Sequence, residues 1–424
     1  MVKILHLFAG AAGAAAAGAA AVGVVELEPQ HAGVPVGWQS QGRAKGSAEL
    51  ELIFAVKQTN LDKLHDTLSR VSDPRHADYG RHLSNDEVHA LVAPAPASLG
   101  AVRAFLAAHG VASDALTPNG DFLRAIVPVS VAEALLSTTY ETYAHNGTDY
   151  VAHRAASYSL PAEVAAVLDF VSPTVHFPPV AQPVPKFDTL GASSASASAS
   201  ASAGSSGNLG VGASKLRELY SVGATVGAGA SSGNRHAVTG FLGQHFHPRD
   251  LGEFWKLEMK GVAAAVPTVK EVGDEVEGGL AGTESMLDIE YINAMGANIE
   301  SEFWGFAGAS PDNPQNEPFI KWLAVVSNTS DAAVPLIFST SYGEEEDSTT
   351  QATADRTNAE FMKAGARGIS LLFASGDSGA APGQGGCKDN KVRRKLARFA
   401  SLPPGACSLP PRAIMMTTPI QHLI

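Results

Sequence analysis

The chain has 424 residues, of which 45% are hydrophobic and 17% are charged. These fractions are typical of a globular protein rather than a disordered one, and the length predicts two domains with a sizeable core. The formal net charge of −12 argues against nucleic acid as a partner, because binding it requires a clustered basic surface.

The N-terminal residues have the pattern of a secretory signal peptide. Lys3 precedes an apolar stretch, residues 4–21, which is dominated by alanine and glycine and ends in Ala-x-Ala-like residues. We therefore expect residues 1–21 to be removed on export. The alternative is an uncleaved signal anchor, but the stretch contains little leucine. No later segment has the pattern of a membrane span, so we expect no membrane association after cleavage.

Residues 30–190 have the pattern of an α+β domain. The spacing predicts strands at 48–57, 122–127 and 140–144, and helices at 60–71, 84–92, 97–109, 131–138 and 161–170. Ser84 and Glu87 are spaced as a capping box at the start of one of these helices. We find no catalytic constellation in this half. Its scattered histidines, His65 and His89 among them, are expected at the surface rather than at a metal.

A low-complexity run of serine and alanine follows. It ends in Gly-Ser-Ser-Gly, and small side chains of this kind offer little to pack, so residues 191–207 are predicted to be a flexible linker. The linker separates the first domain from a second one at 208–385. A tail of different character, residues 386–424, is basic and then rich in proline.

The second domain alternates predicted strands with predicted helices. Apolar runs predict strands at 237–241, 335–340 and 368–374, and helical spacing predicts helices at 288–296 and 350–365. Buried strands separated by helices indicate an α/β fold, a parallel sheet with helices on both faces. Binding sites in such sheets lie at the carboxyl ends of the strands, where Asp377 follows the last predicted strand.

Glu284 and Asp288 are spaced four residues apart, so on a helix they share one face. Two carboxylates this close repel each other, which couples their titration and raises one pKa. Such a pair is often only a solvated helix face. Here the neighbouring residues, such as Leu287 and Ile289, are largely apolar, which favours a functional pair.

The turn around Asp377 allows two other interpretations. Gly-Asp-Ser-Gly at 376–379 is similar to the nucleophile loop of chymotrypsin-like proteases, with Ser378 as nucleophile. That class requires a histidine base in an all-β double barrel, which the alternating pattern contradicts. The other interpretation is a glycine-rich turn in which the aspartate bonds its own backbone.

Several motifs together resemble one family, the sedolisins or serine-carboxyl peptidases. The segment from Glu284 to Asp288 resembles the catalytic Glu-x-x-x-Asp helix of that family, and Phe-Ala-Ser-Gly-Asp-Ser-Gly-Ala, 373–380, resembles its oxyanion loop. Ser-Thr-Ser-Tyr-Gly, 339–343, resembles a substrate-side segment. Ser-Asp-Pro at 72–74, with the residues that follow it, resembles the activation prodomain. The resemblance covers residues 45–385 and is strongest to the tripeptidyl-peptidase branch.

The resemblance implies a subtilisin-like α/β peptidase domain, here incomplete, behind a prodomain that inhibits it intramolecularly and is removed in acid. Glu284 would be the general base, Asp288 would orient it and hold the shared proton, and Asp377 would bind the oxyanion. A carboxylate base suits acidic solution, where a histidine is already protonated, and an aspartate can donate to an oxyanion only when it carries a proton. Ser341, Tyr342 and Gly343 would contact the peptide substrate.

The chain departs from the family in its last forty residues. The family's Ser-Gly-Thr-Ser nucleophile segment and calcium loop are missing from the sequence, so calcium is expected for the family but no metal ligand can be named here. Without a nucleophile the acidic pair has nothing to activate. We therefore expect the chain as printed to be inactive, through a truncated gene model, retained intron or frameshift. The rival hypothesis is a non-catalytic secreted protein whose prodomain inhibits or chaperones an intact relative.

The secretory route gives meaning to two further features. Asn146 and Asn328 are the acceptors of Asn-x-Thr/Ser glycosylation motifs. Cys387 and Cys407 could pair in an oxidising compartment, which the sequence leaves open. Extracellular and lysosomal or vacuolar destinations are equally compatible with the sequence, as are exo- and endopeptidase action.

Overall fold

The computed structural model describes residues 23–29, 34, 37–146, 151–177, 212–274, 281–307, 317–343 and 350–374. The predicted signal peptide, linker and tail lie outside these residues, as do Asp377, Cys387 and Cys407. Among the helices that are described, none alone is long and apolar enough to cross a membrane; one sharply bent pair passes that test by length and composition only.

The N-terminal part is α+β, as predicted. Its elements are β1 (Val24–Pro29), β2 (Trp38–Arg43), β3 (Glu49–Val56), α1 (Leu61–Ser72), α2 (Asn85–Leu91), α3 (Pro96–Ala108), β4 (Asp114–Ala115), β5 (Phe122–Pro128), α4 (Val129–Leu136), β6 (Tyr140–His145), β7 (Val151–Ala155), β8 (Ser157–Pro161), α5 (Ala162–Ala165) and β9 (Leu168–Ser172). They form antiparallel sheets of order β4-β5-β3-β9 and β2-β6-β7, and a pair β1-β8.

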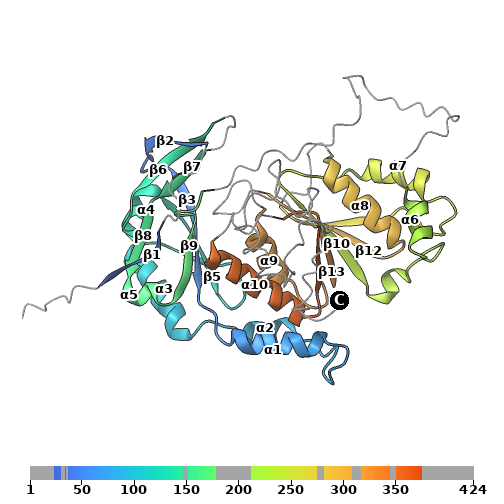
Figure 1. Ribbon diagram of the computed structural model, residues 1–424, viewed down its shortest axis with the longest axis horizontal. Coiled ribbons are helices and arrows are strands. Elements are labelled where there is room, and N and C mark those ends of the chain that lie inside the picture. The colour runs from blue at the N-terminus through green and yellow to red at the C-terminus, as the bar shows by residue number, and fades with distance from the viewer. Residues whose placement is uncertain are drawn as a thin grey trace, which may run out of the picture.

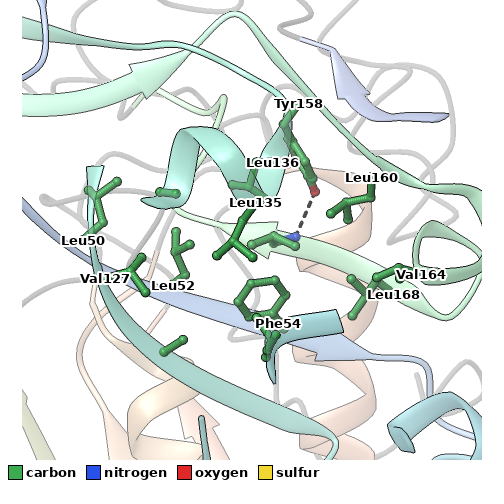
Figure 2. Packing of buried hydrophobic residues seen from close by; sticks show 14 of the residues in the cluster. Leu50, Leu52, Phe54, Val127, Leu135, Leu136, Tyr158, Leu160, Val164 and Leu168 are labelled. Carbon is green, nitrogen blue, oxygen red and sulfur yellow. Dashed lines mark hydrogen bonds between the residues drawn. The ribbon is translucent and has the colours of Figure 1, made fainter. Parts of the chain in front are cut away.

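The core of this part lies between β3 and the helices that cover one face of its sheet (Figure 2). Alternate residues of β3, Leu50, Leu52 and Phe54, point into it, because side chains of a strand alternate between its two faces. Two tyrosine hydroxyls enter this core, those of Tyr140 and Tyr158, and each is hydrogen-bonded. The Tyr158 hydroxyl accepts a 2.8 Å hydrogen bond from the backbone N–H of Val171, which leaves no uncompensated donor there.

In this part the structure confirms one sequence-based prediction and contradicts another. The capping box is confirmed, since the Ser84 side chain accepts from the Glu87 N–H and the Glu87 carboxylate accepts from the Ser84 N–H. The predicted helix 161–170 is wrong. Helix α5 ends at Ala165, and the chain then enters β9, because pairing with β3 buries Phe170 and the residues around it.

The C-terminal part is a parallel α/β sheet, which confirms the predicted fold class. Its elements are α6 (Ala213–Leu219), a 3₁₀ turn (Gly229–Ser232), β10 (Arg235–Phe241), α7 (Pro248–Glu258), β11 (Val269–Gly273), α8 (Thr283–Met295), β12 (Glu300–Phe306), α9 (Phe319–Asn328), β13 (Ile337–Thr340), α10 (Gln351–Ala366) and β14 (Ser370–Phe373). The five strands lie in the order β11-β12-β10-β13-β14, and every pair is parallel.

Helices cover both faces of this sheet (Figure 1). On one face, α8 packs against alternate strand residues, so that Ile289 contacts Val238 and Phe303. On the other face, Trp322 of α9 packs in a cluster with Trp304 and Phe338. Because helices bury both faces of the sheet, successive residues of each strand are apolar, and the strands appear in the sequence as continuous apolar runs.

The two parts pack against each other through α10 and α9. In Figure 1, α10 lies between the parallel sheet and the N-terminal part, with α1 and α2 along it. Four apolar residues from α1, α2 and the residue after α2 form a buried cluster with Ala366 of α10: Leu64, Leu68, Val88 and Val92. The backbone N–H of Leu83 also donates to the Ala366 carbonyl at 2.9 Å.

Candidate active site

The candidate site lies at the carboxyl edge of the parallel sheet. Helix α8 begins at this edge because it follows β11, and Ser341 lies there because it follows β13. Strand β10 has β12 on one side and β13 on the other. The connection through α7 runs from β10 outward to β11 and α8 leads back to β12, whereas α9 leads across to β13 on the other side of β10, so the strand order changes direction beside β10. Ligand sites of open α/β sheets form at such positions.

Polar contacts fix the position of α8 on the sheet. Near its beginning, the Ser285 hydroxyl donates to the His245 carbonyl. Near its end, the Asn293 side chain accepts from Ser301 of β12 at 2.5 Å and donates to the Ile289 carbonyl at 2.7 Å. These contacts hold both ends of the helix, so the side chains between them have a defined place over the sheet.

Both acids are partly buried, and Asp288 has a defined hydrogen-bond partner. Its Oδ1 accepts a 2.7 Å hydrogen bond from the Ser341 hydroxyl, whereas Oδ2 is buried and has no hydrogen-bond partner within the described ranges. Burial raises the pKa of Asp288 to about 7; the nearby charge of Glu284 raises it too, and the Ser341 bond opposes the rise. Asp288 therefore carries a proton in acidic solution.

Glu284 lies one helical turn earlier, in the first turn of α8, and is half-buried. A carboxylate is favoured at this place because the N–H groups of the first turn carry partial positive charge. Leu287, by contrast, is 50% exposed although it lies between the two acids in sequence. The helix thus brings Glu284 and Asp288 together at the sheet edge, as their spacing predicted.

The segment after β13 lines the same edge. The Tyr342 ring packs edge-on against Phe241 at the end of β10, with ring centroids 5.1 Å apart. Burial raises the pKa of Tyr342, and the carboxylates of Asp288, Glu284 and Glu317 raise it further. Gly343 is exposed. The structure thus places Ser341 and Tyr342 beside the acidic pair, and their contact with a substrate stays a prediction.

Glu317 is a titratable residue of this edge that sequence reasoning missed. It lies two residues before α9, is only 7% exposed, and burial raises its pKa to about 7. Its sequence context, a glutamate before Pro318, resembles an ordinary helix start and gives no signal of burial. Only the packing of the α9 entrance beside Tyr342 reveals it.

The predicted glycosylation sites lie at different places. Asn146 is exposed after β6. Asn328 is exposed too, but its Nδ2 donates 2.7 Å hydrogen bonds to the carbonyls of Leu116, in the N-terminal part, and Ala324. Modification at both sites stays a prediction.

A buried charge cluster joins the two parts and was also missed by sequence reasoning. Arg356 and Lys363 of α10 lie 3.2 Å from the same oxygen of Asp121 in the N-terminal part, and Lys363 lies 2.5 Å from Glu360. The Arg356 guanidinium also stacks over the Phe122 ring, 4.1 Å from its centroid. Burial alone would raise the pKa of Asp121, but the two cations hold it well below its usual range.

No group of three or more His, Cys, Asp or Glu side chains that could hold a metal ion is found in the part of the chain that the structure describes. The described residues therefore offer no fit for the calcium ion that the resemblance implies, and no step of the chemistry below depends on it.

Comparison with known proteins agrees with this architecture. Residues 36–177 match the family model of the pro-kumamolisin activation domain. The chain is 37% identical over 359 residues to tripeptidyl-peptidase 1 of Canis lupus familiaris, and 37% identical over 367 residues to that of Rattus norvegicus. It is 36% identical over 359 residues to the Homo sapiens protein.

These matches cover 83% of the chain for the dog and human proteins and 86% for the rat protein. Together they confirm the resemblance to the sedolisin family that the motifs predicted: residues 36–177 match an activation domain, and most of the chain is similar to tripeptidyl-peptidase 1. The chain spans about 60% of the length of the curated relatives it matches.

Proposed function

We propose that this chain is part of the zymogen of an acid serine-carboxyl peptidase of the tripeptidyl-peptidase type, which releases tripeptides from free N-termini. The relatives are named tripeptidyl-peptidase 1. The observation that carries the proposal is the half-buried Asp288, whose Oδ2 lacks a described partner, one helical turn from Glu284 at the carboxyl edge of the sheet.

In this proposal Glu284 is the general base and Asp288 is its partner. Because the pKa of Asp288 is raised to about 7, it holds a proton throughout the acidic range and can share it with Glu284. Glu284 can then accept the proton of a nucleophile at a pH at which a histidine base would be protonated. Asp377 is proposed to donate a hydrogen bond to the oxyanion.

The remaining features belong to the same proposal. Residues 1–21 are a signal peptide, the destination is extracellular or lysosomal or vacuolar, and the activation domain inhibits the peptidase domain until acid releases it. Calcium is a proposed cofactor of the complete domain. The 424 residues contain no Ser-Gly-Thr-Ser segment, so on their own we expect them to have no hydrolase activity.

The test begins with the transcript downstream of the printed sequence. If it encodes an in-frame Ser-Gly-Thr-Ser segment, the longer chain is expressed, activated in acid, and assayed with a fluorogenic peptide that reports cleavage after the third residue. We expect activity that Glu284→Gln lowers by about 10²- to 10⁴-fold, as for loss of a general base. An N-terminally blocked peptide separates exopeptidase from endopeptidase action.

Unchanged activity in Glu284→Gln would overturn the assigned base. A transcript without the segment would instead favour the non-catalytic hypothesis, which predicts that the purified chain inhibits or helps to fold an intact relative.

A further inference from the structure

The hydroxyl of Ser341 contacts one oxygen of Asp288 and not the other. It donates to Oδ1 at 2.7 Å, a normal length for an O–H···O bond, while Oδ2 is buried and has no hydrogen-bond partner among the residues that the structure describes. An orphaned buried carboxyl oxygen is costly unless it is protonated or paired. The two oxygens of Asp288 are therefore not equivalent.

Ser341 is well placed to impose this difference. It directly follows β13, whose residue Thr340 is 1% exposed and whose neighbours on the two sides are β10 and β14. Asp288 lies on α8, which is bonded near its beginning to His245 in the loop after β10 and near its end to Ser301 of β12. The bond thus joins two rigidly supported elements, and the precision of a site depends on such support.

We infer that Ser341 is a positioning residue of the acidic pair: by donating to Oδ1 of Asp288, its hydroxyl leaves Oδ2 as the oxygen that holds the proton shared with Glu284. This inference rests on the proposed function of the pair. It gives Ser341 a task beyond substrate contact, because a serine that turned away would let either oxygen take the proton.

The charged and titratable groups around Asp288 come from three elements. Glu284 lies on the same helix, Tyr342 follows β13, and Glu317 precedes α9 near Tyr342. None of these three is a cation, so among the residues that the structure describes the Ser341 hydroxyl is the group that favours the ionised form of Asp288. Removal of the Ser341 hydroxyl should therefore raise the pKa of Asp288, so that the proton is held more tightly.

The experiment is a titration of Asp288 in the full chain, which needs no hydrolysis. Side-chain carboxyl groups of aspartate are labelled with ¹³C and followed by NMR, and the Asp288 signal is assigned by its loss in Asp288→Asn. In Ser341→Ala we expect the midpoint of this titration to rise by about half to one pH unit, the equivalent of one ordinary hydrogen bond.

Two variants serve as controls. Ser341→Thr keeps the hydroxyl and should keep the midpoint, and Ser339→Ala removes a serine of β13 that is not bonded to Asp288. If Ser341→Ala does not fold, Ser341→Cys replaces it, since a thiol is a weak donor of similar size.

A midpoint that does not move in the folded variant, or that moves equally in Ser341→Thr, overturns the inference. Failure of the proposed function would show differently. In that case no complete chain would hydrolyse peptides, while the Asp288 titration would still respond to Ser341.

Discussion

At Asp288, burial and hydrogen bonding act in opposite directions on one carboxyl group. Burial penalises the charged form and dominates, so the pKa rises to about 7, while the Ser341 hydroxyl favours the charged form. The folded protein thus keeps a proton on Asp288 over a range in which the unfolded chain, with an ordinary aspartate pKa of about 3.9, has already lost it.

This difference predicts a pH dependence of stability. Because the folded state binds the proton more tightly, the contribution of Asp288 favours folding below about pH 4 and is lost as the pH rises toward 7. Asp288→Asn removes this dependence. We expect its free energy of unfolding to exceed that of the wild type by on the order of 3 kcal/mol at pH 8 but not at pH 4, measured by urea titration.

Asp66→Asn is the matched control, since the Asp66 side chain on α1 is 72% exposed. Glu317 and Glu290, whose pKa values burial also raises to about 7, contribute in the same direction in every variant. The prediction fails if Asp288→Asn and Asp66→Asn change stability equally at both pH values.

The sequence predicted the identity of the acidic pair but not the environment of either acid. Spacing by four residues places Glu284 and Asp288 on one face of any helix, whatever surrounds it. The partner of Asp288 is 53 residues away along the chain, in Ser341, and no local pattern encodes such a contact. The burial of Asp288 depends on how α8 packs against β10, which is a property of the assembled sheet.

At the scale of elements, α10 has two packing faces. One covers the parallel sheet, where Ala364 joins its core, and the other carries Arg356 and Lys363 to Asp121 of the N-terminal part. The helix was predicted from its spacing at 350–365, close to the observed Gln351–Ala366. The spacing carried no signal that its charged residues are buried, because only the presence of the N-terminal part turns that face inward.

This arrangement predicts a strong effect of Asp121→Ala. The Arg356 and Lys363 side chains are 2% and 3% exposed, so loss of the carboxylate leaves two buried cations with less compensation. Breaking one partner of a buried ion pair costs about 3–5 kcal/mol. We expect a loss of this size in the apparent free energy of unfolding by urea.

The control is Asp114→Ala, which removes a pair with Arg124 in which the Asp114 side chain is 80% exposed. An exposed pair contributes about 1 kcal/mol or less. Equal losses in the two variants would show that the Asp121 cluster does not hold the two parts together. Because the pKa of Asp121 is depressed, the contribution of Asp121 to the free energy of unfolding is fully present above about pH 4. It persists in mild acid and is lost only as the pH falls toward the lowered pKa.

At the scale of the whole molecule, His89 lies in the contact between the two parts. The sequence predicted a surface histidine, and this was wrong: His89 on α2 is 6% exposed, with Nε2 3.3 Å from the Ser327 carbonyl of α9 and Nδ1 without a hydrogen-bond partner in the described chain. The physical reason is that α2 packs on α9 and α10, which no pattern within α2 indicates.

The burial of His89 predicts that acid weakens this contact. Burial lowers its pKa; Lys363 and Arg367 lower it as well, while Asp121 and the Ser327 carbonyl act against them. Because the pKa of His89 is lowered, the contribution of buried, neutral His89 to stability is fully present above about pH 6.5. It is lost as the pH falls, because the unfolded chain binds the proton first. The contribution of His89 to the stability of the wild type should therefore fall between pH 7.5 and pH 5, while the buried carboxyl groups described above act in the opposite direction.

His89→Gln cannot take up this proton but keeps a side-chain N–H for the Ser327 carbonyl. From pH 7.5 to pH 5 we expect the apparent unfolding temperature of His89→Gln to rise relative to that of the wild type, because the buried carboxyl groups act equally in both proteins. His65→Gln, on the exposed side of α1, should behave as the wild type does. The same change in unfolding temperature in all three proteins would show that His89 does not contribute to the acid response.

The sequence by itself determined several local features of this protein: the capping box at Ser84, some of the helices and strands, the parallel α/β class of the C-terminal part, and the pairing of Glu284 with Asp288. These depend on periodicities and spacings within one segment. Only the tertiary structure decided the protonation of Asp288, the contact with Ser341, the burial of Glu317, and the face of α10 that meets Asp121. Each of these depends on which distant segment excludes water from the group, and exclusion of water is what fixes the free energy of a charge.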